Sequence, residues 1–326
     1  MSLYPLKFKT QAYEKIWGAN RIKERFSKED LKADNIGETW ELSGVEGSES
    51  VVINGKYKDN NINELTEVFM DELVGDKVFQ KYGNKFPLLF KLIDTSDYLS
   101  IQVHPDDEMA QQRHNSLGKT EMWYVVDSEE DSTIINGFNK DLTKEEYLNH
   151  LNNNTLRKVL EEGKTQAGDT YFIPAGRVHA IGKNILLAEI QQSSDVTYRI
   201  FDWNRVDDEG NPRQLHTEEA VDVIDYSKIQ NPKVDYKREI NSTTQLVECP
   251  YFVCNLLWFD KIVEKAYVGI DSFVAYMVVE GAFAVHYNGE EVEVVRAGET
   301  ILIPAIIEEV KLEPIVPSKA LEVYHP

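Results

Sequence analysis

Four side chains in the first half of the chain are of types that bind a divalent metal ion. Gln102 and His104 stand two residues apart at the end of a predicted strand, so both point to one face of it. Glu121 opens the next predicted strand, and His179 follows a Pro-Ala-Gly turn. Two imidazoles, a carboxylate and a neutral amide oxygen suit a borderline divalent ion. Taken singly, each also has an ordinary interpretation, as a solvated strand face, a strand-end carboxylate or a surface histidine.

Short strands are the elements that must position these residues. Apolar runs alternate with turns rich in Gly or Asn, the pattern of a sandwich or jelly-roll barrel. The predicted strands are 40–43, 50–53, 88–93, 98–103, 122–126, 171–174, 185–190, 196–201, 252–258, 273–279 and 283–287. We therefore predict a mainly β fold of two jelly-roll β-barrels with a few short peripheral helices.

The predicted helices are fewer and lie between the strands. They are 63–73, 105–113, 143–151, 155–162 and 217–225. Thr143 and Glu146 have the spacing of a capping box at the start of one of them. The third and fourth helices form a small helical insert around 138–163.

An internal repeat indicates that the barrel occurs twice. The stretch Gly168–Ala175 reads GDTYFIPA, and Gly298–Ala305 reads GETILIPA. The first copy leads to His179, whereas the second copy has no histidine there. We predict an N-terminal catalytic barrel over 1–235 and a C-terminal barrel without a metal site over 236–326, joined by a polar linker.

Charge and composition restrict the partners. The 326 residues carry a formal net charge of −21, which repels nucleic acid and anionic membranes. The N-terminus has no leader pattern and no segment is apolar enough to span a bilayer, so we predict a cytoplasmic protein. Cys249 and Cys254 are predicted to be free thiols. No oligomeric state follows from the sequence.

Q-x-H, then Glu, then G-D-x-x-x-x-P-x-G-x-x-H is the order in which a cupin barrel collects its metal ligands. On these motifs the chain resembles the type I mannose-6-phosphate isomerases (phosphomannose isomerases) in their short bacterial form. The resemblance covers essentially the whole chain, and it rests on residues 99–105, 118–124, 173–180 and 189–199, with Trp17-Gly18 and 40–43 in support. It implies that both barrels are of the cupin type.

The resemblance also implies the chemistry, which is interconversion of mannose 6-phosphate and fructose 6-phosphate through a cis-enediol. The implied ligands of one zinc ion per chain are Gln102, His104, Glu121 and His179. The implied substrate-binding residues are Lys91, Ser100, Lys119 and Arg199. Lys119, Arg199 and Glu189 are the implied catalytic residues. Glu189 is the leading candidate for the base, and Asp195 and a metal-bound water stay open.

Lys91 supports an anionic substrate independently of the resemblance. It interrupts the apolar run 88–93, where an unpaired buried ammonium would be costly, so an anion is expected nearby. The alternative is a lysine that extends to water at the rim of the barrel. Arg199 has the planar fork that binds phosphate with two hydrogen bonds.

Two other functions fit part of the pattern. An iron-dependent cupin oxygenase would use two histidines and one carboxylate, but Gln102 and the cations Lys91 and Arg199 argue against it. A non-catalytic sugar-binding double cupin would bind without turnover, and the intact ligand set argues against that function. His114, on the approach to Glu121, is predicted to be a surface residue.

Overall fold

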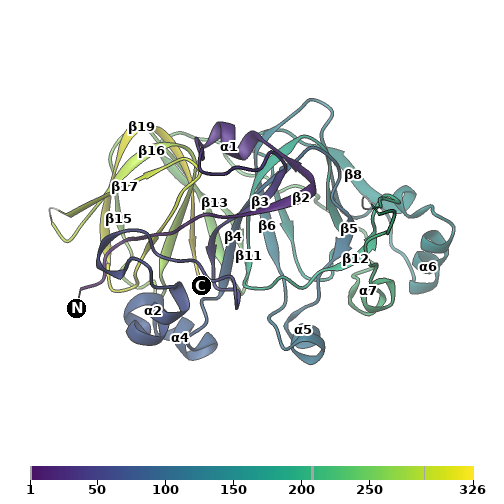
Figure 1. Cartoon of the computed structure of the whole chain (residues 1–326), viewed down its shortest axis with the longest axis horizontal. Helices are drawn as coiled ribbons and strands as arrows, with labels where there is room; N and C mark the ends of the chain where they lie inside the picture. The colour runs from purple at the N-terminus through teal and green to yellow at the C-terminus, as the bar shows by residue number, and fades with distance from the viewer. Residues whose placement is uncertain (1, 207–208, 290) are drawn as a thin grey trace.

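Antiparallel strands dominate the computed structural model, which describes residues 2–206, 209–289 and 291–326 (Figure 1). They form three sheets, and this confirms the predicted mainly β fold. Two of the sheets belong to the first part of the chain and the third mostly to the last part. The two groups of strands lie side by side along the long axis in Figure 1.

The first barrel is built from a six-stranded and a five-stranded sheet. The six-stranded sheet runs β2 (Gln11–Ala19), β3 (Ile36–Ser43), β4 (Leu88–Thr95), β11 (Ile185–Gln192), β6 (Glu121–Ser128) and β9 (Thr170–Ile173). The five-stranded sheet runs β12 (Tyr198–Phe201), β5 (Ile101–Val103), β10 (His179–Ile181), β7 (Thr133–Phe138) and β8 (Leu160–Lys164). Trp123 and Leu187 from the first sheet pack with Ile134 and Ile181 from the second in one buried cluster. The inner faces of the two sheets therefore enclose a common interior.

The second barrel is a single eight-stranded sheet. Its main path is β1 (Leu6–Lys7), β18 (Thr300–Ile303), β16 (Val274–Tyr287), β19 (Glu309–Tyr324), β14 (Val253–Phe259) and β13 (Ser242–Glu248). The strands β15 (Val263–Ala266) and β17 (Glu291–Arg296) pair with β19 and β16. The N-terminal strand thus completes a sheet made by the C-terminal part, with Leu6 opposite Leu302. The boundary at 235/236 stays a prediction.

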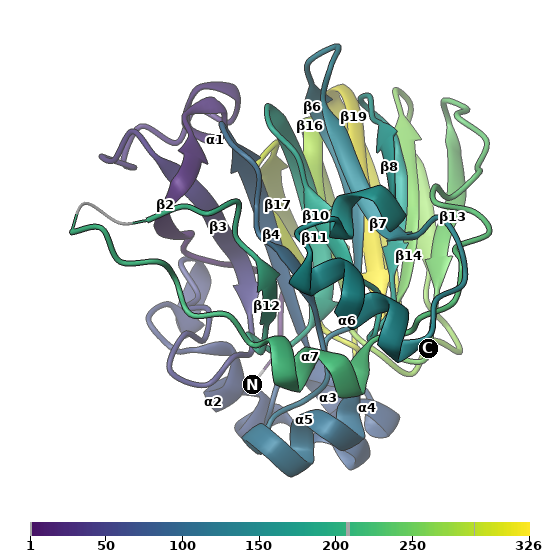
Figure 2. The ribbon, with the colours of Figure 1, turned by 90° about the vertical axis from the view of Figure 1, so that its right-hand side faces the viewer.

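Helices lie outside the sheets. They are α1 (Arg21–Arg25), α2 (Ile62–Phe69), α3 (Asp71–Val74), α4 (Asp76–Tyr82), α5 (Asp107–His114), α6 (Lys144–Asn152) and α7 (Thr217–Val223), with 3-10 turns η1 (Gly55–Tyr57) and η2 (Leu156–Val159). Figure 2 shows α6 and α7 outside the five-stranded sheet, where Tyr147 and Ala220 pack on its outer residues Val103 and Ala180. That sheet is therefore covered on its outer face and can present polar side chains on its inner face.

Of three local predictions, one is confirmed and two are wrong. The capping box of Thr143 and Glu146 is confirmed, because each side chain accepts a hydrogen bond from the other residue's backbone N–H. The predicted helix 155–162 is wrong: η2 gives one turn and the chain then enters β8, which pairs with β7. The predicted strand 50–53 is also wrong, because Val51 and Val52 form only isolated bridges.

The internal repeat has the same geometry in both barrels. Gly168 and Gly298 both adopt a φ of +84°, a conformation that glycine tolerates best, at the turn before β9 and β18. Each of these strands then pairs antiparallel with a strand of its own barrel, β9 with β6 and β18 with β16. The sequence repeat therefore marks equivalent positions in two related barrels.

Two further sequence expectations concern the molecule as a whole. Both cysteines, Cys249 and Cys254, are free thiols, as predicted. Among the described residues, no helix is both long and apolar enough to cross a membrane.

Candidate metal centre and active site

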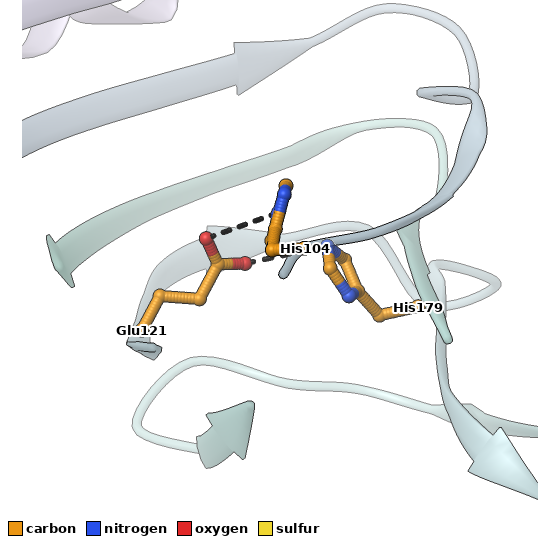
Figure 3. A group of neighbouring side chains, drawn as sticks. All are labelled: His104, Glu121 and His179. Atoms are coloured by element: carbon orange, nitrogen blue, oxygen red, sulfur yellow. Dashed lines mark ion pairs between the residues drawn. The ribbon is translucent and has the colours of Figure 1, made fainter. Parts of the chain in front are cut away.

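Two histidines and one glutamate meet inside the first barrel (Figure 3). His104 directly follows β5, Glu121 opens β6 and His179 opens β10, so three strand ends deliver them. The Nε2 atom of His104 lies 3.5 Å from Oε2 of Glu121, and that of His179 lies 3.4 Å from Oε1. All three side chains are buried, and their ligand atoms lie within 4.8 Å of one another. Three of the four predicted metal ligands thus form one cluster.

Hydrogen bonds turn both imidazoles toward the centre of this cluster. Nδ1 of His104 donates to the carbonyl of Val196 at 3.0 Å, and Nδ1 of His179 donates to that of Arg177 at 2.8 Å. The Nε2 lone pairs therefore face Glu121. Both Nε2 atoms and both carboxylate oxygens are buried and have no hydrogen-bond partner among the described residues. Buried polar atoms without partners are costly, and a bound divalent cation would satisfy all four at once.

Burial controls the charges of the cluster in the metal-free protein. It lowers the pKa of both imidazoles, to about 3 for His179, so both rings are neutral at pH 7. Burial and the negative charge of Glu189 raise the pKa of Glu121 to about 8. A metal ion would reverse the effect on Glu121, because the ion stabilises the carboxylate.

Metal binding at pH 7 is therefore expected to release about one proton per ion, mainly from Glu121. Calorimetric titration of the metal-free protein in two buffers of different ionisation enthalpy measures this number. The release should decrease at about pH 9, where Glu121 is already mostly ionised. Metal binding at pH 7 without proton release would contradict the raised pKa.

Gln102 lies next to the cluster through strand pairing. It stands directly opposite His179 on β10 and opposite Arg199 on β12, so the three side chains form a row across three strands. Gln102 also lines the cavity described below. Its position fits a fourth ligand, and its coordination stays a prediction.

A cavity of about 440 Å³ opens beside Gln102 between the two sheets. The remaining predicted site residues line it. They are Lys91, Ser100, Lys119, Glu189 and Arg199, with Asp195 among the further lining residues. The structure thus brings together residues that are up to about a hundred positions apart in the chain. In an acidic protein, this cavity concentrates positive charge.

Lys91 is buried in the wall of this cavity with two carboxylates beside it. Its Nζ lies 3.2 Å from Oε1 of Glu189 and 3.8 Å from Oε2 of Glu38, and it faces the ring of Trp40. Although burial opposes its charge, the two carboxylates raise the pKa of Lys91. Lys91 is only 6% exposed, which argues against a lysine that extends to water at the rim.

Glu38 is a functional candidate that the sequence interpretation missed. Although burial favours its neutral form, Lys91 and Lys15 lower its pKa to about 2, so Glu38 is ionised in the cavity wall. Nε1 of Trp40 donates to it at 3.1 Å. The sequence feature that could have identified Glu38 is its period-two spacing with Trp40, in a strand whose inner face is polar.

Glu189 is held by one hydrogen bond and one ion pair. Nε1 of Trp123 donates to its Oε2 at 2.8 Å, and Lys91 pairs with its Oε1. Lys119 lies beside the His104–Glu121–His179 cluster, with its Nζ 3.4 Å from Oε2 of Glu121. A carboxylate and two ammonium groups therefore surround the space next to the cluster.

Strand register relates this arrangement to the second barrel. In the first barrel Glu121 stands opposite Ile173, the last residue of its repeat strand. In the second barrel the equivalent Ile303 stands opposite Val274. The carboxylate of the predicted ligand Glu121 is therefore replaced by an apolar side chain in the second barrel.

The second barrel does, in contrast, have a carboxylate equivalent to that of Glu189. Glu189 stands opposite Trp123 and Lys91, and Glu322 stands opposite Tyr276 and Asn255 at the equivalent positions. The hydroxyl of Tyr276 donates to Glu322 at 2.9 Å, and Nδ2 of Asn255 donates to it at 3.1 Å. A buried carboxylate held by strand neighbours thus occurs in both barrels, and in the first barrel it lies beside the His104–Glu121–His179 cluster.

His114 lies outside the cavity. It is exposed at the end of α5, and its Nε2 lies 2.8 Å from the hydroxyl of Tyr198. This agrees with its predicted role as a surface residue.

The fold and the site define a two-barrel protein with a buried His-Glu-His cluster that could hold a metal ion, next to a cationic cavity. A family model described as phosphomannose isomerase type I, catalytic domain, matches residues 5–120. Mannose-6-phosphate isomerase ManA of Bacillus subtilis is 37% identical over 96% of this chain and 97% of its own length. Mannose-6-phosphate isomerase of Streptococcus mutans is 35% identical, over 93% of each chain.

A solved structure shows the same relationship. The crystal structure of mannose 6-phosphate isomerase from Bacillus subtilis matches with a TM-score of 0.88 and 31% identity, over 99% of this chain and 100% of that chain. The chain therefore belongs to the type I phosphomannose isomerase family. This membership confirms the predicted family and the cupin-type architecture.

Proposed function

We propose that this protein interconverts mannose 6-phosphate and fructose 6-phosphate in a metal-dependent reaction. The observation that carries the proposal is the His104–Glu121–His179 cluster at the side of a cavity lined by lysines and arginines. Such a site suits a sugar that carries a phosphate and two reacting oxygens. The full-length similarity to named mannose-6-phosphate isomerases supports the same substrate.

The metal in this proposal is one zinc ion per chain. His104, Glu121 and His179 would hold it, and Gln102 would complete the set through its amide oxygen. Imidazole and carboxylate donors around one ion suit zinc. When bound, the ion would act as a Lewis acid toward the carbonyl and the adjacent hydroxyl of the sugar.

The chain's own residues supply the proton transfer. Isomerisation moves a proton between C2 and C1 through a cis-enediol, which requires a base and a positive environment for the enediolate. Glu189 is the proposed base, since it is a carboxylate that lines the cavity beside the cluster. Lys119 is proposed to stabilise the developing negative charge, because its ammonium lies next to Glu121. Arg199 is proposed to act with Lys119 from the opposite sheet.

The two barrels differ in their proposed roles. The metal ligands, the base and the substrate-binding residues proposed above lie between residues 91 and 199, inside the proposed N-terminal domain 1–235. The C-terminal barrel, 236–326, is proposed to be structural, since Val274 takes the place of the carboxylate ligand. We also propose a cytoplasmic location, which the two free thiols support.

The test of this function is conversion of mannose 6-phosphate by the purified, metal-loaded protein. Fructose 6-phosphate is followed through glucose-6-phosphate isomerase and glucose-6-phosphate dehydrogenase as NADPH absorbance. We expect sustained turnover in both directions. Binding of mannose 6-phosphate without any product would instead indicate a sugar-binding protein.

A further inference from the structure

Three arginines gather at one side of the cavity around a single buried aspartate. Arg199 belongs to β12, Asp202 follows that strand, and Arg205 and Arg213 lie on the segment after it. Arg199 and Arg213 both line the cavity. Neither Arg205 nor Arg213 is part of the site predicted from the sequence.

Asp202 fixes the position of Arg213. It is 5% exposed, and it accepts hydrogen bonds from Nε of Arg213 at 2.7 Å and from Nη2 at 2.5 Å. Nη2 of Arg205 donates to the same carboxylate at 2.6 Å. Arg205 also lies 3.8 Å from a second carboxylate, that of Asp97, whereas Asp202 is the ion-pair partner of Arg213. The Arg213 side chain nevertheless remains 31% exposed on the cavity side.

Arg199 adds positive charge that has no counter-ion among the described residues. Its Nη1 donates to the backbone carbonyl of Gln214 at 2.8 Å, and its Nε is buried without a hydrogen-bond partner in the described structure. Burial and the positive charges of Arg213 and Arg205 lower the pKa of Arg199, although the negative charge of Asp202 opposes this effect. An anion between Arg199 and Arg213 would offset these positive charges and accept the free Nε–H.

We infer that Arg213, positioned by Asp202, binds the phosphate group of the substrate together with Arg199. The inference rests on the proposed function and extends it by assigning the orientation of the sugar. His179, Gln102 and Arg199 form a row across three neighbouring strands, so His179 and Arg199 are two strand spacings, about 10 Å, apart. A hexose 6-phosphate with C1 and C2 at the metal cluster has its phosphate at the opposite end, on the arginine side.

This arrangement makes Arg213 a specificity residue. A guanidinium binds a phosphate with two parallel hydrogen bonds, and a free sugar offers no group that replaces them. Arg213 therefore favours phosphorylated sugars over mannose itself. Asp202 acts as a positioning residue, because it contacts Arg213 and not the substrate.

The experiment compares Arg213→Met and Arg213→Lys with a matched control, Arg157→Met. Arg157 makes an equivalent two-bond pair with Glu162, at 2.7 Å for each bond, and is not among the residues that line the cavity. Two quantities are measured on the metal-loaded proteins: the KM for mannose 6-phosphate, and the dissociation constant of inorganic phosphate by calorimetry. We expect Arg213→Met to raise both at least about tenfold, Arg213→Lys to raise them less, and Arg157→Met to leave them unchanged.

An unchanged phosphate dissociation constant in Arg213→Met would overturn the inference. Asp202→Asn provides a second, independent variant: it should also weaken phosphate binding, with a smaller effect on kcat than on KM. If Asp202→Asn lowered kcat by the same factor as it raised KM, Asp202 would have a structural role only. This result would contradict its positioning role. If the wild-type protein does not isomerise mannose 6-phosphate, the proposed function fails, whereas the phosphate titration still tests Arg213.

Discussion

Glu121→Gln is expected to lose the bound metal and to lower kcat/KM for mannose 6-phosphate by about a thousandfold or more. Glu121 contributes the carboxylate of the His104–Glu121–His179 cluster, and an amide in its place supplies no negative charge to hold the ion. Lewis-acid stabilisation of the transition state is worth several kcal/mol, and each 1.36 kcal/mol is a factor of about ten in rate. Atomic emission for metal content and the coupled assay for turnover measure the two effects.

The fold of this variant should survive. In the metal-free protein burial raises the pKa of Glu121 to about 8, so the neutral acid that Gln resembles is the main form at pH 7. Circular dichroism of the variant should therefore match that of the metal-free wild type. Retained metal together with retained turnover in Glu121→Gln would remove this residue from the ligand set.

Glu189→Gln should lower kcat by a factor of about 10² to 10⁴ and leave the metal content unchanged. Glu189 lies beside the cluster without belonging to it, and it is fixed by Trp123 and Lys91. Gln keeps the shape and one hydrogen bond but cannot accept the proton from the sugar carbon. The measurement is kcat on the metal-loaded variant, with metal stoichiometry as the accompanying readout.

The second barrel offers a matched control for this substitution. Glu322 occupies the equivalent position, is buried, and accepts from Tyr276, Asn255 and Lys265. We expect Glu322→Gln to lower the Tm by a few degrees, because a buried ion pair with Lys265 is broken, and to leave kcat unchanged. Near-normal turnover in Glu189→Gln would exclude it as the base and leave Asp195 and a metal-bound water as candidates.

The architecture could be predicted from the sequence where the local residue pattern matches the element that forms in the fold. The two-residue spacing of Gln102 and His104 correctly predicted which side chains of the β5 region face the interior. The repeat that begins at Gly168 and at Gly298 correctly predicted equivalent turns in both barrels. The error at 155–162 has a physical reason. The segment has helical propensity, but β8 gains more by pairing with β7 than a short isolated helix would.

The candidate site was readable only in part, because part of it depends on contacts between distant segments. Glu38 acquires its significance from Lys91, which stands on the neighbouring strand and more than fifty residues later. Arg213 lies in a segment without strand or helix periodicity, and its position beside the cavity depends on its contact with Asp202. The equivalence of Glu322 and Glu189 is recognised from the strand register. Sequence spacing does not show it, because the number of residues between the repeat and this carboxylate differs between the two barrels.

The most direct test of metal-dependent isomerisation at this site is activity during removal and return of the metal. The protein is stripped with a chelator, assayed for conversion of mannose 6-phosphate to fructose 6-phosphate, and then titrated with zinc. We predict that turnover disappears on stripping and returns in proportion to occupancy, reaching a plateau at one ion per chain. Turnover that survives complete removal of the metal would contradict the proposed mechanism.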